Sequence, residues 1–221
     1  RTAFFYVTES GTDPDNPYPV KGIDVSVFQK EIDWEGIKDE GIAFAFVKAT
    51  EGASHVDSNF QTNWEGARSA GIATGAYHFL SFDSDADKQA DNYINNVPKK
   101  WSALPPVVDV ELYGSYTSDP PSADFVREKL DIVLQRLEKR YHKTPIIYTN
   151  GYLYDKYISG YFDEYSIWIS DPDIPEKLSD GNEWTFCQYT FKGYSRHVAG
   201  GDKYVDFNVF NGSEWDFRKY R

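Results

Sequence analysis

Methionine is absent from this chain, cysteine occurs once, and no apolar run is long enough to cross a membrane. The single cysteine, Cys187, excludes an intrachain disulfide, and a chain of 221 residues can bury a core that needs none. Cys187 lies in an expected strand, where a buried and unreactive thiol is the simplest interpretation. Because no initiator methionine is present, we expect a mature or trimmed form from which a leader was removed.

Positive charge is also scarce, with 23 Lys and Arg against 35 Asp and Glu and a net charge of -12. Affinity for nucleic acid comes mostly from Lys and Arg, so this balance argues against a nucleic-acid partner. The 4 histidines lack metal-ligand spacing, and neither a glycine-rich phosphate loop nor a Gly-x-Ser-x-Gly motif is present. The sequence therefore predicts no metal and no cofactor.

Two acids, Asp109 and Glu111, interrupt an apolar strand pattern at residues 105–112. Strand residues alternate between faces, so Val107 shares a face with both acids while Val108 lies on the other face. A buried carboxylate costs several kcal/mol unless it is hydrogen-bonded, paired or protonated. We therefore interpret the pair as part of a site. The alternative is a strand end, with Glu111 in solvent and Asp109 paired with a lysine.

Strand and helix patterns alternate in the first half of the chain. Strand patterns occupy residues 22–28, 43–50, 73–82, 105–112, 145–150, 165–171, 184–190 and 205–210. Helical patterns occupy residues 33–41, capped by Asp33, 58–71, opened by a capping box of Ser58 and Gln61, and then 84–96, 122–142 and 152–158. The early strands are rich in Val, Ile, Ala and Phe, as parallel strands covered on both faces are.

This order predicts an α/β protein with a single irregular, TIM-like (β/α) barrel whose helices are missing in the C-terminal half. A doubly wound open sheet is the alternative. Residues 1–20 are rich in Pro and turn-forming residues, and we expect an N-terminal lead-in or linker there. Residues 21–221 would form one barrel domain.

Single acids repeat the same pattern in the first and last strands, at Asp24 and Asp206. The active site of such a barrel lies at the C-terminal ends of its strands. The first and last strands of a closed barrel are neighbours, so we expect Asp24 and Asp206 to lie side by side. By alternation Tyr77, Tyr148 and Gln188 should face the barrel mouth, although a core position suits the two tyrosines equally well. Carboxylates with aromatic side chains favour glycoside hydrolysis as the chemistry.

Short motifs follow one another along nearly the whole chain, from about Gly22 to Gly212. They are Gly22-Ile23-Asp24-Val25-Ser26 followed by Gln29, Val47-Lys48-Ala49-Thr50-Glu51-Gly52, Gly75-Ala76-Tyr77-His78-Phe79, Asp109-Val110-Glu111 and Val205-Asp206-Phe207-Asn208. In this order they resemble glycoside hydrolase family 25, the lysozymes of the Chalaropsis type. The resemblance implies a flattened (β/α) barrel short of helices. It also implies cleavage of the β-1,4 bond between N-acetylmuramic acid and N-acetylglucosamine in peptidoglycan.

The resemblance also implies roles for individual residues. Glu111 would be the general acid, and Asp109, Asp24 and Asp206 the other acids of the site. The positions that would contact sugar are Tyr77, Tyr148, Trp168 and Gln188. Peptidoglycan glycan strands would be the partner of a monomer that is secreted or works in the cell envelope. One departure is Cys187, where the family often has Trp, and it affects local packing alone.

Spacing limits the mechanism. Residues i and i+2 of a strand lie about 6.5–7 Å apart at Cα, and neighbours on one face cannot flank a sugar from opposite sides. We therefore expect the 2-acetamido oxygen of the substrate to attack C1, with Asp109 holding the amide N–H and Glu111 protonating the leaving oxygen. The charge of Asp109 should raise the pKa of Glu111. An inverting mechanism, with Asp24 or Asp206 as the base, is the alternative.

Two other functions are compatible with these acids. One is a chitinase-like hydrolase of N-acetylglucosamine polymers, and the other is a non-catalytic barrel that binds wall sugars.

Overall fold

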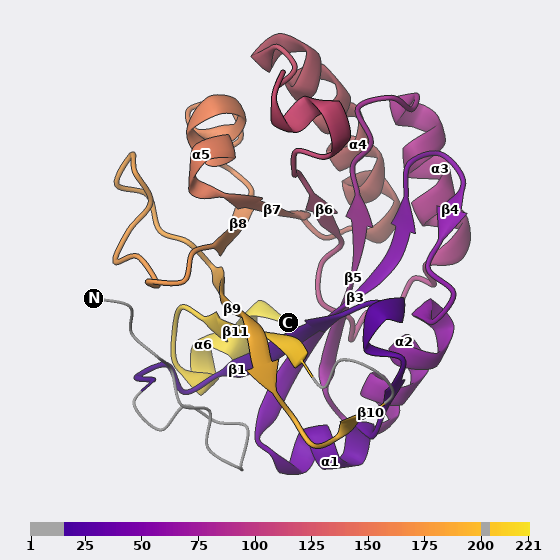
Figure 1. Ribbon diagram of the computed structural model, residues 1–221, viewed down its shortest axis with the longest axis vertical. Helices are drawn as coiled ribbons and strands as arrows, with labels where there is room; N and C mark the ends of the chain where they lie inside the picture. Colours follow the sequence, from indigo (N-terminus) through magenta and orange to yellow (C-terminus); the bar gives the residue numbers. More distant parts are fainter. Residues whose placement is uncertain (1–15, 200–203) are drawn as a thin grey trace.

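The computed structural model describes residues 16–199 and 204–221, so the expected lead-in lies mostly outside the described residues. Eight strands close into a barrel (Figure 1). In chain order they are β1 (Lys21–Val25), β3 (Ile42–Glu51), β5 (Ala73–Phe79), β6 (Val107–Asp109), β7 (Ile146–Asn150), β8 (Ser166–Ser170), β9 (Phe186–Tyr194) and β11 (Tyr204–Phe210). Pairing between β1 and β3 completes the ring, so the predicted barrel is confirmed and the open sheet is wrong.

One strand departs from an all-parallel barrel. β11 pairs antiparallel with both β1 and β9, whereas every other neighbouring pair in the ring is parallel. The N-terminal end of β11 therefore lies at the same end of the barrel as the C-terminal ends of the other strands. Asp206, the third residue of β11, stands directly opposite Asp24 of β1. The expectation that these two acids are neighbours is confirmed.

Helices cover the barrel mainly in its first half. They are α1 (Trp34–Asp39), α2 (Phe60–Ser69), α3 (Ala86–Asn96) and α4 (Ala123–Tyr141), the long magenta helix of Figure 1. After β7 a short α5 (Gly151–Leu153) continues into a π-helical turn, Tyr154–Ile158, and residues 171–185 between β8 and β9 contain no helix. The predicted loss of helices toward the C-terminus is confirmed. None of the described helices is long and apolar enough to span a membrane.

The smaller elements lie at the ends of these strands and helices. Two short pairings add β4 (His55–Val56) to the end of β3 and join β2 (Glu31–Ile32) to β10 (Val198–Ala199). Two 3-10 turns follow barrel strands, η1 (Val27–Gln29) after β1 and η2 (Gly114–Thr117) after β6.

Several predicted boundaries shift because side chains bond to the backbone. The first strand ends at Val25, since Ser26 and Gln29 form a capping box that turns the chain into η1. The capping box expected at Ser58 and Gln61 is wrong. Helix α2 begins at Phe60, and the Gln61 amide donates to Glu65 within the helix instead. The cap expected at Asp33 is confirmed, because its carboxylate accepts the Gly36 N–H.

Helix α6 (Glu214–Tyr220) was not predicted, although Ser213 and Asp216 form a capping box at its start. Its Phe217 is buried against Phe44 and Phe210, with ring centroids 5.7 and 5.2 Å away. Phe44 lies near the start of β3 and Phe210 at the end of β11. Phe217 therefore fills the end of the barrel interior opposite the C-terminal ends of the parallel strands.

The barrel separates two apolar cores. The inner core is aromatic and includes Phe44, Phe46, Tyr148, Trp168, Phe186, Phe210 and Phe217. The outer core lies between strands and helices, and its aliphatic residues include Val108, Val110, Leu130 and Leu134. Val107 belongs to the inner core, so the alternation predicted for its strand is confirmed. Because inner aromatic residues fill one end of the barrel, polar side chains gather at the other end.

Candidate active site

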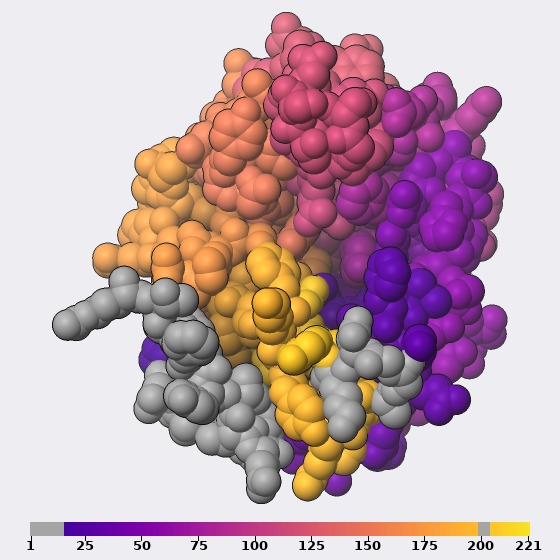
Figure 2. All heavy atoms as spheres, in the orientation of Figure 1, coloured from indigo at the N-terminus to yellow at the C-terminus, as the bar shows by residue number. Residues whose placement is uncertain are grey.

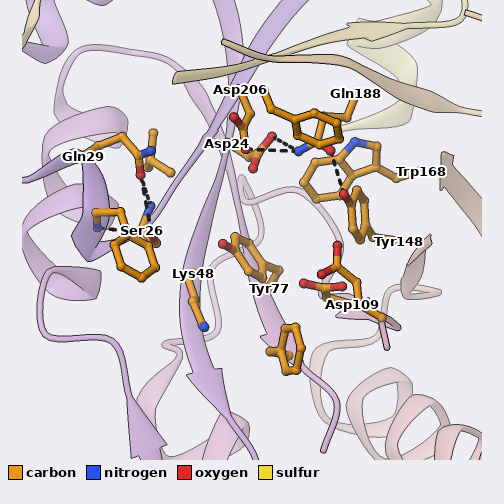
Figure 3. A pocket seen from close by; sticks show the side chains of 15 residues that line it. Asp24, Ser26, Gln29, Lys48, Tyr77, Asp109, Tyr148, Trp168, Gln188 and Asp206 are labelled. Atoms are coloured by element: carbon orange, nitrogen blue, oxygen red, sulfur yellow. Dashed lines mark hydrogen bonds between the residues drawn. The ribbon is translucent and has the colours of Figure 1, made fainter. Parts of the chain in front are cut away.

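A cleft of about 340 Å³ opens at the C-terminal ends of the parallel strands (Figure 3). All eight side chains predicted to form the site line this cleft: Asp24, Tyr77, Asp109, Glu111, Tyr148, Trp168, Gln188 and Asp206. They come from seven strands and the residues just beyond them, so only the closed barrel brings them together. In the space-filling view the surface is hollowed where the two halves of the chain meet (Figure 2).

Asp24 and Asp206 form one side of the cleft. Asp24 is 7% exposed, and its Oδ2 accepts hydrogen bonds from Gln188 Nε2 at 2.8 Å and Asn208 Nδ2 at 2.7 Å. Burial and the adjacent charge of Asp206 raise the pKa of Asp24 well above its usual range. Burial also raises the pKa of Asp206, to about 6. The two carboxyl groups therefore lose their protons at a higher pH than isolated aspartates do.

Hydrogen bonds to aromatic residues fix both amides that hold Asp24. The Tyr148 hydroxyl donates to Gln188 Oε1 at 2.6 Å, and the Trp168 indole N–H donates to Asn208 Oδ1 at 2.7 Å. Each amide must then present its NH₂ group to Asp24. Asn208 stands in one of the recognised motifs, yet no role was predicted for it, because its function depends on a contact with Trp168, 40 residues away.

Asp109 and Glu111 form the opposite side of the cleft. Asp109 ends β6, which lies four strands away from β11 in either direction around the ring. The Asp109 side chain is 7% exposed, and its Oδ1 atom is buried without any hydrogen-bond partner among the described residues. Glu111 lies two residues beyond the strand end and is half-buried. Since a buried oxygen without a partner is costly, it indicates a place for a donor from a ligand.

The ionisation of Asp109 and that of Glu111 depend on each other. Burial raises the pKa of Glu111, opposed by a hydrogen bond with Tyr148 and by the charge of Lys48. Burial and then the charge of Glu111 raise the pKa of Asp109 well above its usual range. We had expected repulsion by Asp109 to raise the pKa of Glu111. Burial is instead the first cause for both groups, and the repulsion acts on Asp109, the more buried partner.

Two of the predicted sugar contacts are largely buried. Trp168 is 2% exposed and stacks on Phe46 with ring centroids 4.4 Å apart, and Tyr148 packs against Trp168 at 4.5 Å. Both rings belong to the inner core while one edge of each reaches the cleft. Tyr77 lies on the same side as Asp109 in Figure 3. His78, its neighbour in β5, faces away and is fully buried.

The structure adds cleft residues that sequence reasoning missed. Lys48 lines the cleft and forms an ion pair with Glu51 at 2.7 Å. Phe28 and Phe191 also line the cleft, and they are 77% and 56% exposed. Phe79 lines the cleft as well, and it could have been found, because it stands in a recognised motif and shares a strand face with Tyr77. Alternation gives the wrong face for Phe191, since it lies an odd number of positions, three, after Gln188.

The comparison with protein families agrees with this geometry. The model of glycosyl hydrolases family 25 matches residues 23–198, which include every cleft residue except Asp206. The chain belongs to glycosyl hydrolases family 25. The fold and the family that the motifs predicted are thus confirmed.

Relatives of this family 25 hydrolase extend over nearly the whole chain. An uncharacterized protein of Escherichia coli O6:H1, YegX, is 39% identical over 201 residues, covering 89% of this chain and 71% of its own length. Lysozyme M1 of Streptomyces globisporus is 33% identical over 214 residues, which cover 88% of this chain and 68% of the length of that lysozyme. A solved family 25 glycosyl hydrolase of Bacillus anthracis is 42% identical with a TM-score of 0.87. The match covers 93% of this chain and 94% of the Bacillus chain. The hydrolase fold is therefore shared over nearly the whole chain.

Proposed function

We propose that this family 25 hydrolase is an N-acetylmuramidase that cleaves the β-1,4 bond between N-acetylmuramic acid and N-acetylglucosamine in peptidoglycan, outside the cytoplasm. The observation that supports it most directly is that Asp109 lines the cleft while its buried Oδ1 has no hydrogen-bond partner among the described residues. Sugars with a 2-acetamido group offer an amide N–H for such an acceptor. Lysozyme M1, at 33% identity, carries the corresponding activity in its name.

Glu111 acts as the general acid. It is half-buried beside Asp109, its pKa is raised by burial, and its position at the cleft leaves it open to the glycosidic oxygen. In the first step its proton passes to the leaving oxygen while the bond between that oxygen and C1 breaks. Glu111 is left as a carboxylate. It then takes a proton from the water that completes hydrolysis.

Asp109 acts on the acetamido group rather than on C1. When the amide N–H donates to Asp109 Oδ1, the hydrogen bond stabilises the ionised form of that carboxylate. The proton that the Asp109–Glu111 pair shares is then retained by Glu111, where it is needed. The acetamido oxygen, polarised by the same contact, attacks C1 as the leaving oxygen departs.

Asp24 and Asp206 lie across the cleft from Glu111 and face the positive charge that develops on the sugar ring. Their carboxyls are anchored through Gln188 and Asn208, so they keep their orientation while that charge forms. Preorganised groups of this kind stabilise a transition state without having to move. Because of their position across from Glu111, the same two acids could serve as base for a water, which would make the enzyme inverting.

Digestion of purified peptidoglycan tests the proposal. Mass spectrometry of the released fragments should show N-acetylmuramic acid at the new reducing ends. N-acetylglucosamine there would indicate a different cut, as in a chitinase-like enzyme, and no release would indicate a barrel that only binds wall sugars. Proton NMR of the first-formed anomer tests the mechanism. A β product supports acetamido assistance, and an α product would establish inversion instead.

A further inference from the structure

Two strongly exposed phenylalanines line the cleft, Phe28 and Phe191, and the chemistry above gives neither of them a role. Phe28 is 77% exposed and Phe191 is 56% exposed, and both line the same cleft as the acids. Apolar side chains exposed together in a concave site commonly mark a place where a ligand binds. Neither ring carries a hydrogen-bonding group, so each can offer only its apolar faces.

The backbone that carries Phe28 is held rigidly. Ser26 Oγ accepts the Phe28 N–H at 3.3 Å, and Gln29 Oε1 accepts the Ser26 N–H at 2.8 Å. Asp57, which is 3% exposed, accepts the Val27 N–H at 2.9 Å. The exposed ring therefore stands on a fixed turn. When a ligand packs on this ring, the protein loses little conformational entropy, because the turn is already ordered.

Irregular pairing places Phe191 on the cleft side of β9. In the pairing with β11, Asn208 faces Gln188 while Phe207, the next residue back, faces Thr190, so β9 contains an extra residue there. Such a bulge reverses the alternation of side chains. Phe191 consequently shares the cleft with Gln188, although an undisturbed strand would point them to opposite faces.

The sheet order places both rings near the same acids. Phe28 follows the end of β1 and Phe191 lies on β9, and β11 with Asp206 runs between these strands. The two phenylalanines thus border the Asp24–Asp206 side of the cleft, across the barrel from Asp109. A glycan strand that enters between the two acidic pairs extends past them.

We propose that Phe28 and Phe191 form a subsite for an additional sugar ring of the glycan strand, outside the two rings that the cleaved bond joins. Each ring packs its face on the C–H surface of a pyranose. The subsite makes the enzyme prefer long glycan strands over short oligosaccharides. This inference rests on the proposed muramidase function.

Peptide-free oligomers of alternating N-acetylglucosamine and N-acetylmuramic acid provide the test. We compare kcat/KM for an octasaccharide with kcat/KM for a tetrasaccharide, in the wild type, Phe28→Ala, Phe191→Ala and the double variant. The ratio should fall about fivefold in each single variant, which corresponds to about 1 kcal/mol. The fall in this ratio should come mainly from a higher KM for the octasaccharide. The Phe28→Trp variant, which keeps an aromatic ring, should show the wild-type ratio.

A matched control is Trp215→Ala, which removes another aromatic residue, 63% exposed, from α6 at the far end of the barrel and should keep the wild-type ratio. An unchanged ratio in the double variant would overturn the subsite. So would a loss confined to glycans that still carry stem peptides, because the rings would then contact peptide. If the wild type cleaves no oligomer, the proposed function fails; if it cleaves them and the ratio does not move, only the subsite fails.

Discussion

Replacing Asp206 with asparagine should stabilise the fold at neutral pH while it lowers activity. Burial is the first cause that raises the pKa of Asp206 from 3.8 to about 6, and the charge of Glu111 adds to it. A carboxyl group whose pKa is higher in the folded chain favours folding when it is protonated. The contribution of Asp206 to the free energy of unfolding is fully present below pH 3.8 and is lost as the pH rises through about 6.

The expected magnitude follows from the same values. The difference between 3.8 and about 6 corresponds to about 3 kcal/mol, since one pKa unit is worth about 1.4 kcal/mol. Because the Asp206 carboxyl is only partly shielded from water, this is an upper limit. The Asp206→Asn variant cannot ionise there, and its amide can donate to Asp24. At about pH 8 it should gain up to about 3 kcal/mol, or about 6–12 °C in Tm, and at about pH 3.5 the gain should vanish.

Urea unfolding followed by circular dichroism, repeated from about pH 3.5 to about pH 8, measures this difference directly. The control is Asp39→Asn, which removes the same charge from an exposed position on α1 and should change stability little at any pH. The reasoning is refuted if Asp206→Asn is less stable than the wild type at about pH 8, or if its stability difference does not vary with pH.

Three further predictions test the acid, the outer core and the inner core. Glu111→Gln should lose about 10²–10⁴-fold in kcat with the fold intact and no loss in Tm, and an active variant would contradict the role of Glu111 as acid. His78 is buried between Thr50 and Gln89 with a pKa lowered from 6.5 to about 4, so its contribution to stability should be lost as the pH falls from 6.5 to about 4. That loss amounts to about 3 kcal/mol, and a His78→Asn variant that keeps the same pH slope in urea unfolding would exclude it. Phe217→Ala should cost about 3–5 kcal/mol, measured by the same unfolding assay, and a loss below about 1 kcal/mol would show that Phe217 does not support the inner core.

The local sequence determined much of the fold, because side-chain periodicity depends on immediate neighbours. The apolar stripe of α4, the buried strands of the first half and the cap at Asp33 all arise from residues within a few positions of one another. The two acids beside Val107 were recognisable for the same reason, since alternation along one strand is a local property. Helix α6 was not predicted, because it is short and is stabilised by the packing of Phe217 in the inner core, which is a tertiary contact.

Tertiary structure decided how the recognised residues act together. The antiparallel course of β11 places Asp206 opposite Asp24, and the ring order puts Asp109 across the cleft from both. The orientation of Gln188 and the orphaned Asp109 Oδ1 depend on contacts between residues far apart in the chain. The bulge that turns Phe191 into the cleft depends on strand pairing. The sequence by itself thus determined which acids line the cleft, while burial and cross-strand contacts, which no local pattern specifies, decided their pKa shifts and their partners.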